Sequence, residues 1–347
     1  MVGGARSQSI VRIWFSDRTV YGAGKSPHPS PPLHCSMTAA PPAPPCPVTG
    51  EPAVRLVQSI KSGFLTRAWR YAFRVNAAPT LMQHAFYHLW ESPSGLHFFD
   101  PMVEGDHEFY TGLYSRLSFM DTWWLDHTRH EFRLAARHIN TGDRVLDMGC
   151  GSAIFRNAIP QASYLGLDPN FAEGRGIDYI RNETLADHLV AHAGQYDVAC
   201  AFQVLEHLEK PAATYADLVR AVRPGGLVII GVPHVPSAAT RIPNFLINAP
   251  PHHLTWWTRP ALAALAERHG TSVAAIEQVP WGTQDAFVYW TARFSPIRCK
   301  DIYFKNRVSW HLSVLLGSVA ARLMHTLGRV PKVKDEGASL LLVARKI

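Results

Sequence analysis

The sequence has few of the features that mark a secreted or membrane-spanning protein. Five cysteines in 347 residues are too few, and odd in number, for a disulfide framework. No run approaches the roughly 20 consecutive apolar residues that span a bilayer. No basic start followed by a small-residue cleavage site marks a signal peptide. We therefore expect a soluble cytoplasmic protein.

Positive charge is scarce in the middle of the chain. The net charge of +7 belongs to the two ends, because residues 1–36 carry +3 and residues 293–347 carry +8. Residues 37–292 are left with −4. A basic groove through the main domain is not expected, so the sequence predicts no nucleic-acid partner.

The first 50 residues are rich in proline and lack any helical or strand period. We predict a disordered lead over residues 1–45, a small lobe over residues 46–109 and a main domain over residues 110–347. Translation from Met37 instead of Met1 is an open alternative for the lead.

The sequence does contain a regular alternation of short apolar strands and helical segments. A helical period covers residues 110–139. Strands are predicted at Arg144–Met148, Ser163–Leu167, Tyr179–Ile180, Tyr196–Ala201, Leu227–Val232, Val273–Val279 and Ser339–Arg345. Helices between them are predicted at Glu183–His192, Pro211–Val222 and Pro260–His269. This alternation is typical of an α/β fold whose parallel sheet is covered on both faces and binds its ligand at the carboxyl ends of the strands.

A glycine turn, Asp147-Met148-Gly149-Cys150-Gly151, follows the first of these strands. Glycine there permits positive φ and a close approach of the backbone to a ligand. The turn lacks the lysine and hydroxyl of a phosphate-binding P-loop, and Ile154 stands at the third glycine of a dinucleotide fingerprint. A second acid, Asp168, closes the next strand, where a carboxylate can accept two hydrogen bonds from a ribose diol.

In their order and spacing these motifs resemble the class I S-adenosylmethionine-dependent methyltransferases. The closest likeness is to the small-molecule branch that includes the ubiquinone O-methyltransferases. The likeness also rests on Tyr196-Asp197-Val198, Gln203–Leu208 and Arg223–Leu227, and it covers roughly residues 110–280 and the last strand. It implies a Rossmann-like, doubly wound sheet of seven strands, mostly parallel with an antiparallel last strand, and S-adenosylmethionine as the cofactor.

The cofactor-binding residues that this resemblance implies follow four successive strands: Asp147, Gly149, Cys150, Gly151, Asp168, Asn182, Glu183, Thr184 and Gln203. The glycine turn would lie against the methionine part of the cofactor, with Asp147 orienting the turn or meeting the amino group. Asp168 would bind the ribose, residues 182–184 would lie near the adenine, and Gln203 beside the sulfonium. Ala153 stands where the family usually has another glycine, and we expect binding to tolerate its methyl group.

Four residues on the same edge of the sheet are candidates for contact with the methyl acceptor: Glu206, His207, His252 and His253. Methyl transfer requires alignment of the acceptor and management of one proton, and histidine suits a base near neutral pH. We expect at least one of the four to touch the acceptor. The alternative is that they only begin or cap helices. No i, i+4 or Cys-x-x-Cys spacing supports a metal, so no metal is expected.

Two segments of the small lobe, Cys46–Gly50 and Glu91–Pro101, resemble the halves of a zinc ribbon that often precedes this branch. Thr49, Glu91 and Ser94 replace three of its four cysteines, so we expect this ribbon to bind no zinc. Apolar packing would hold the lobe together instead, through Phe64, Trp69, Phe86 and Trp90.

A helical insertion is predicted over residues 285–338, with an amphipathic helix at Val308–Leu327. One interpretation is that this helix packs over the active site or a dimer face. The alternative, suggested by the basic residues around it, is that it lies on an anionic membrane.

The sequence as a whole predicts transfer of a methyl group from S-adenosylmethionine to a small molecule, with oxygen favoured as the acceptor atom. Two alternatives stay open. One is a methyltransferase directed at nitrogen or at a macromolecule, and the other is a non-catalytic, cofactor-binding partner protein.

Overall fold

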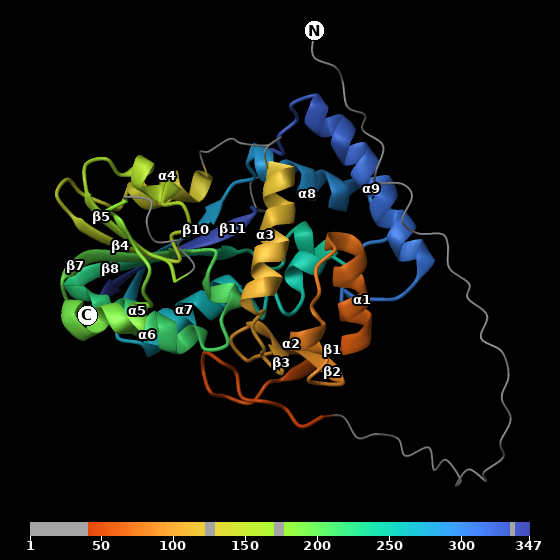
Figure 1. Cartoon of the computed structure of the whole chain (residues 1–347), viewed down its shortest axis with the longest axis horizontal. Helices are drawn as coiled ribbons and strands as arrows, with labels where there is room; N and C mark the ends of the chain where they lie inside the picture. Colours follow the sequence, from red (N-terminus) through yellow and green to blue (C-terminus); the bar gives the residue numbers. More distant parts are fainter. Residues whose placement is uncertain (1–40, 122–128, 170–176, 334–336) are drawn as a thin grey trace, which may run out of the picture. The chain divides into compact units, whose positions relative to one another are not determined.

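A seven-stranded sheet forms the centre of the computed structural model, which describes residues 41–121, 129–169, 177–333 and 337–347. The strand order is β10-β11-β8-β7-β4-β5-β6, and β11 alone runs antiparallel to its neighbours (Figure 1). The strands are β4 (Arg144–Met148), β5 (Ser163–Leu167), β6 (Ile180–Arg181), β7 (Tyr196–Phe202), β8 (Val222–Pro233), β10 (Thr271–Val279) and β11 (Ser339–Lys346). The predicted fold class is confirmed.

The sheet is covered on both faces because its central strands are apolar on both sides. Every residue of 198–202 in β7 and of 340–344 in β11 is buried. One face packs against α4 (His130–Ala136) and the 3-10 helix η1 (Ile154–Ala158). The other face packs against α5 (Leu185–His192), α6 (Pro211–Ala221) and α7 (Arg259–Arg268) (Figure 1).

The helical pattern predicted over residues 110–139 is interrupted in the structure. Helix α3 covers His107–Asp121, and α4 begins at His130 after an extended Arg129 (φ −61°, ψ 127°). Residues 122–128 lie outside the described residues. The other predicted helices begin and end within two residues of the observed ones, whereas β8 begins at Val222 instead of Leu227.

A second, antiparallel sheet joins the N-terminal lobe to the main domain, in the order β1-β2-β3-β9. The lobe contributes β1 (Arg55–Lys61), α1 (Ser62–Phe73), α2 (Ala78–Leu81), β2 (Phe86–Glu91) and β3 (His97–Asp100). The fourth strand, β9 (Thr255–Trp256), comes from the loop that was expected to face the acceptor. The lobe therefore supports that loop through shared strand pairing.

The predicted apolar packing of the lobe is correct only in part. Trp69 is fully buried in the lobe, whereas Trp90 packs into the cluster beneath the main sheet. The prediction for Phe86 is wrong, because this side chain is 40% exposed. Phe86 stacks on His88 two residues later, since alternate residues of a strand share a face.

The ribbon-like segment keeps a tight turn at its remaining cysteine. Cys46 is buried, and its Sγ accepts hydrogen bonds from the backbone N–H groups of Val48 and Thr49, each at 3.5 Å. On the other half, the hydroxyls of Ser92 and Ser94 lie 2.9 Å apart. That this segment binds no zinc stays a prediction.

The insertion before β11 contains α8 (Thr283–Phe294) and α9 (Val308–Thr326). Helix α9 buries one face, which includes Gly317, where a Cβ would lie 2.5 Å from the carbonyl oxygen of Thr291. Glycine therefore lets α9 approach the end of α8 closely. Within the described residues, no helix combines the length and the apolar character needed to cross a bilayer.

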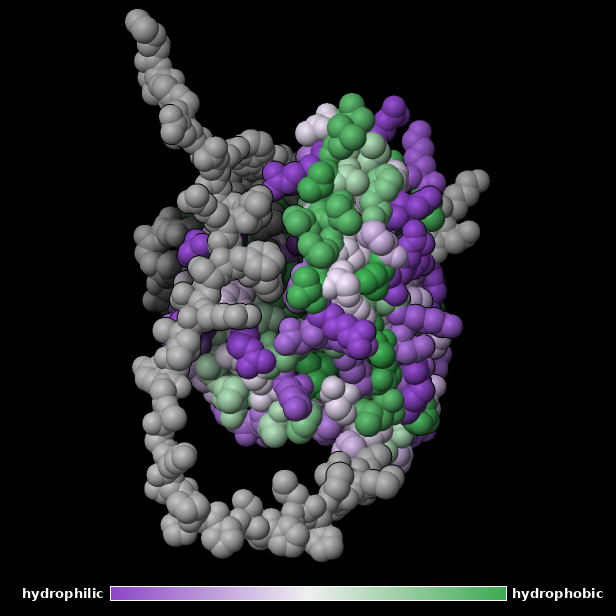
Figure 2. Space-filling view, turned by 90° about the vertical axis from the view of Figure 1, so that its right-hand side faces the viewer, coloured by the Kyte–Doolittle hydropathy of each residue, from purple (hydrophilic) through white to green (hydrophobic). Residues whose placement is uncertain are grey.

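The opposite face of α9 is apolar and open to solvent in the described part of the chain, and the expected packing of this helix over the active site or a dimer face stays a prediction. Figure 2, which looks onto the side where α9 lies, shows a band of apolar side chains beside hydrophilic ones. The exposed apolar residues on and next to α9 are Val308, Leu312, Leu315, Leu316, Val319, Leu323, Leu327 and Val330.

Candidate active site

The glycine turn lies at the carboxyl end of β4. The strand order reverses at β4, because β5 lies on one side of it and β7 on the other. Gly149 has φ +69°, and a Cβ there would lie 2.7 Å from Cγ2 of Val204, so both conformation and packing require glycine. Gly151 has φ +55° and open space where a Cβ would point. The turn thus leaves room against its backbone, as the methionine part of the cofactor would need.

Asp147, the last acid before the turn, is buried inside the sheet. Its carboxylate accepts hydrogen bonds from the Tyr164 hydroxyl at 2.7 Å and the Cys200 thiol at 3.6 Å. Burial raises the pKa of Asp147 to about 7, although both hydrogen bonds favour the charged form. This position fits a residue that orients the turn.

Asp168 lies at the end of β5, beside the turn, and its Oδ2 accepts a hydrogen bond from the Gly151 N–H at 2.9 Å. Residues 182–184 follow β6 on the same edge of the sheet. The Glu183 carboxylate accepts from His188 Nδ1 at 2.8 Å, and the Thr184 hydroxyl caps α5 by accepting from the Asp187 N–H at 3.2 Å. The contacts of Glu183 and Thr184 order the junction between β6 and α5. The roles of residues 182–184 toward adenine stay predictions.

Gln203 follows β7 with φ +59° and reaches toward α4. Its Nε2 donates to Glu131 Oε2 at 3.0 Å and to the Ser339 hydroxyl at 3.3 Å. Glu131 is 3% exposed and pairs with Arg129, which favours its charged form, while burial raises its pKa. No local motif marks Glu131 in the sequence, because it meets Gln203 across 72 residues of chain.

Ala153 follows the turn in a conformation that usually requires glycine. It has φ +55° and ψ 35° and is 4% exposed, immediately before η1. For a residue with a Cβ this left-handed conformation costs about 1–2 kcal/mol. The local backbone thus keeps the geometry of a glycine position although alanine occupies it.

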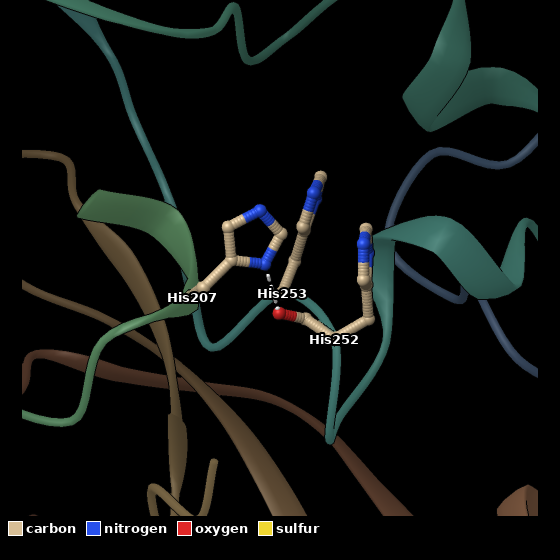
Figure 3. Close-up of side chains that lie close together, drawn as sticks. All are labelled: His207, His252 and His253. Atoms are coloured by element: carbon tan, nitrogen blue, oxygen red, sulfur yellow. Dashed lines mark hydrogen bonds between the residues drawn. The ribbon is translucent and has the colours of Figure 1, made fainter. Parts of the chain in front are cut away.

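Three histidines from two separate loops meet on the same edge of the sheet (Figure 3). His207 ends the 3-10 helix η2 (Leu205–His207), which follows β7, while His252 and His253 lie between η4 (Leu246–Asn248) and β9. One ring nitrogen from each residue lies within 4.8 Å of the others. The His252 and His253 rings are stacked with centroids 4.5 Å apart, and the His207 ring lies 4.5 and 4.9 Å from them.

Hydrogen bonds fix the same tautomer on all three rings. The Nδ1 atom of His207 donates to the His252 carbonyl oxygen at 2.6 Å, and that of His252 donates to the Ile247 carbonyl at 2.9 Å. His253 Nδ1 donates to Asn248 Oδ1 at 3.2 Å. Because these oxygens can only accept, each Nδ1 carries the proton and each Nε2 keeps a lone pair. Burial lowers the pKa of His207 to about 4 and those of His252 and His253 well below the usual value, so all three rings are neutral.

Glu206 lies beside this histidine cluster (His207, His252 and His253) and is 1% exposed. Its Oε1 is 3.8 Å from His207 Nε2, and neither carboxylate oxygen has a hydrogen-bond partner among the described residues. Burial raises the pKa of Glu206 to about 8. The Glu206 carbonyl accepts from the Leu254 N–H at 2.7 Å, which ties the two histidine-bearing loops together.

The lobe and α3 hold the histidine loop from the other side. Trp69 Nε1 donates to the Pro250 carbonyl at 2.8 Å, and the Gly105 N–H donates to the Pro251 carbonyl at 3.2 Å. The rings of Tyr110 and Tyr114, on α3, contact the His252 ring. The sequence indicated these tyrosines only as parts of a helix, and a role beside the cluster had no local signal.

Val204 connects the glycine turn to the histidine cluster. It packs against Gly149 and its carbonyl accepts from the His207 N–H at 3.0 Å. All the predicted site residues thus lie at the carboxyl edge of the sheet, and the four acceptor candidates come together in one group. The fold also assembles three imidazoles that no local spacing in the sequence connects, and the absence of a metal stays a prediction.

Comparisons with known proteins agree with this architecture. Residues 124–276 match a family model described as a methyltransferase domain. The chain is 29% identical over 164 residues to the ubiquinone biosynthesis O-methyltransferase of Escherichia coli O9:H4 (strain HS), covering 38% of this chain and 66% of the relative. A second match, to the same enzyme of E. coli O139:H28, is 35% identical over 98 residues and covers 24% of this chain and 40% of the relative. The chain thus matches less than two thirds of the length of these relatives.

Among solved structures, the 1,6-didemethyltoxoflavin-N1-methyltransferase of Burkholderia thailandensis has a TM-score of 0.41 and 15% identity, covering 75% of this chain and 95% of that one. The family match identifies residues 124–276 as a methyltransferase domain, and the observed sheet order agrees with it. The lobe over residues 46–109 and helices α8 and α9 lie outside the matched range.

Proposed function

We propose that the protein transfers the methyl group of S-adenosylmethionine to an oxygen of a small-molecule acceptor. The observation that carries this proposal is the contact through Val204, which connects the glycine turn to the histidine cluster. The ubiquinone O-methyltransferase relatives support an oxygen acceptor.

Each part of the site has a distinct task in this proposal. S-adenosylmethionine supplies an electrophilic methyl group, so the protein has to align the acceptor and manage one proton. The glycine turn and Asp168 hold the donor side. On the acceptor side, the Nε2 lone pair of His207, which is 13% exposed, accepts a hydrogen bond from the acceptor hydroxyl. Tyr110 and Tyr114 present aromatic rings beside this position.

The experiment is transfer of labelled methyl from S-adenosylmethionine to a panel of phenols, catechols, sugars, amines, RNA and protein. We expect label on a phenol or catechol oxygen. His207→Ala should lower kcat by about a hundredfold, in the range for a group that manages a proton. His84→Ala, which removes an exposed histidine outside the cluster, is the matched control and should leave the rate unchanged.

Label only on an amine, RNA or protein would replace the oxygen-directed function with the first alternative. Tight binding of S-adenosylmethionine without transfer to any acceptor would leave the non-catalytic partner protein.

We further propose that α9 lies on an anionic membrane surface. Its exposed apolar residues recur every three or four positions, from Val308 to Leu327, as on a helix that lies in the bilayer interface. No Asp or Glu occurs between residues 308 and 330, and exposed basic side chains flank the band at Arg307, Arg322, Arg329 and Lys332. Apolar area and positive charge together select anionic lipid over a neutral partner surface. Lys334 also lies in this basic stretch of sequence, outside the described residues.

A further inference from the structure

The histidine cluster has the arrangement of a metal site, and we propose that His207, His252 and His253 bind one divalent transition-metal ion of the zinc class through their Nε2 atoms. The three rings come from two loops, and one ring nitrogen of each lies within 4.8 Å of the others. Three histidines with an open fourth position are the ligand set of a catalytic zinc site.

The hydrogen bonds of the cluster favour this use over simple packing. In each ring the Nδ1–H group is already bound to an oxygen, of His252, Ile247 or Asn248. A metal-ligating histidine characteristically donates its other N–H in this way, which fixes the tautomer and aims the free nitrogen. Three independent rings share this pattern.

Glu206 provides a second, independent observation. Its carboxylate is 1% exposed, lies 3.8 Å from His207 Nε2 and has no hydrogen-bond partner among the described residues. A buried carboxylate without a partner is costly, and a neighbouring cation would offset that cost. Carboxylate oxygen is also a normal ligand of such ions.

The cluster would have to tighten to hold an ion. Metal–nitrogen bonds of about 2.0–2.1 Å in tetrahedral geometry place the nitrogens about 3.3 Å apart, so the rings would close by no more than about 1.5 Å. The stacked His252 and His253 rings would also have to tilt toward each other, because the lone pair of each ligand nitrogen lies in the plane of its ring.

The bound ion would determine which acceptors the site takes. The fourth position of a three-histidine site is open to an oxygen ligand, so a phenol or catechol hydroxyl would be the favoured chemical class. With the ion bound, that hydroxyl would bind the ion instead of the His207 Nε2 lone pair, which the ion would occupy. This last step rests on the proposed methyltransferase function, whereas the ion site itself does not.

The test is titration of the metal-stripped full-length protein with Co²⁺, followed by its visible absorption, with Zn²⁺ as the competitor. We expect one Co²⁺ per chain, displaced by Zn²⁺. His207→Ala and His253→Ala should each weaken binding at least tenfold, and the exposed-histidine control His84→Ala should not. Glu206→Gln should weaken it less than loss of a histidine does. Far-UV circular dichroism of each variant separates loss of a ligand from loss of folding.

Calorimetry with S-adenosylmethionine on the same metal-free sample keeps the two proposals apart. Donor binding without any Co²⁺ binding would overturn the metal site and leave the methyltransferase function standing. Co²⁺ binding without donor binding would support the metal site and count against the methyltransferase function. Co²⁺ binding that His207→Ala and His253→Ala leave unchanged would place the ion elsewhere and overturn the inference.

Discussion

At the scale of single residues, Ala153 offers the most direct link between backbone conformation and stability. Its φ of +55° is unfavourable for any residue with a Cβ, and the alanine side chain can form no hydrogen bond that would offset this cost. We predict that Ala153→Gly stabilises the protein by about 1 kcal/mol, measured by urea unfolding. Ala216→Gly, inside helix α6, should instead destabilise it by about 1 kcal/mol. Destabilisation by Ala153→Gly would show that the alanine methyl contributes more through packing than the conformation costs.

Asp147 predicts a pH dependence of stability with a definite sign. Its pKa is about 7 in the folded protein and 3.8 when unperturbed, so the folded state binds the proton more tightly. Stability from this group is therefore full below about pH 4 and falls by about 1.4 kcal/mol per pH unit until pH 7. The asparagine of Asp147→Asn does not titrate, so the free energy of unfolding of this variant should rise relative to that of the wild type between about pH 4 and pH 7. Above about pH 8 this difference should stay constant. A difference that does not change with pH would contradict this account.

Asp197→Asn is the control of opposite sign. Slight burial opposes ionisation of Asp197, but hydrogen bonds from the Arg144 N–H and the Arg223 side chain outweigh it, and its pKa is lowered. Its stabilising effect is present at neutral pH and is lost as the pH falls below the usual range of a carboxyl group. The variant should therefore be less stable than the wild type at pH 7 and equal to it in strong acid, as chemical unfolding at each pH would show.

The residues that could be predicted from the sequence are those that local motifs mark. The glycine turn and Asp168 follow apolar strands directly, so a single segment of sequence places each at the carboxyl edge. Glu131 and Tyr114 could not be found this way, since they reach the site only by long-range packing of α4 and α3. The grouping of His207 with the His252–His253 pair also depends on how two loops are folded together.

At the scale of secondary-structure elements, the lobe supports the histidine loop through one tryptophan. Trp69→Phe would leave the Pro250 carbonyl without the bond that Nε1 donates at 2.8 Å in a fully buried site. We expect it to cost about 1–3 kcal/mol of stability, the penalty for an unsatisfied buried acceptor. Trp290→Phe removes the same kind of bond, to the Arg329 carbonyl, in a partly exposed place, and should cost far less in thermal unfolding. Equal costs would show that the buried bond has no special role.

Helix α9 predicts the behaviour of the protein on lipid. The wild type should co-sediment with vesicles that contain anionic lipid and be released as salt rises, because positive charge contributes to the binding. Leu316→Glu puts a charge into the apolar band and should weaken this binding at least tenfold. Val190→Glu is the matched control, since Val190 is 89% exposed on α5, away from the band in sequence. Binding that Leu316→Glu leaves intact would exclude this face as the lipid contact.

The elements show why strands of the main sheet were easier to predict than those of the lobe. β4, β5 and β7 each contain a short run of buried residues, and their bounds agree with the prediction to within a residue. Strand β1 has a single buried residue, Ile60, and β9 has only two residues. β9 forms only because β3 lies beside it, which no local pattern could indicate.

At the scale of the whole molecule, the two sheets and their shared loop explain how one chain joins donor and acceptor sides. The main sheet positions the glycine turn, and the lobe sheet positions the loop with His252 and His253 through β9. The hydrophobic cluster under the main sheet includes Trp90 and Phe98 of the lobe, so the lobe and the sheet share apolar core as well as strand pairing. The histidine cluster is therefore held in place jointly by both parts of the chain.

The central claim, that the glycine turn and Asp168 form a donor site, is tested most directly by calorimetry with S-adenosylmethionine. We predict micromolar binding by the wild type and a loss of at least tenfold in Asp168→Ala, which corresponds to about 1.4 kcal/mol or more. Asp217→Ala, which removes a carboxylate from the surface of α6, is the control and should bind as the wild type does. Absence of binding by well-folded wild-type protein, or equal binding by Asp168→Ala, would contradict the account.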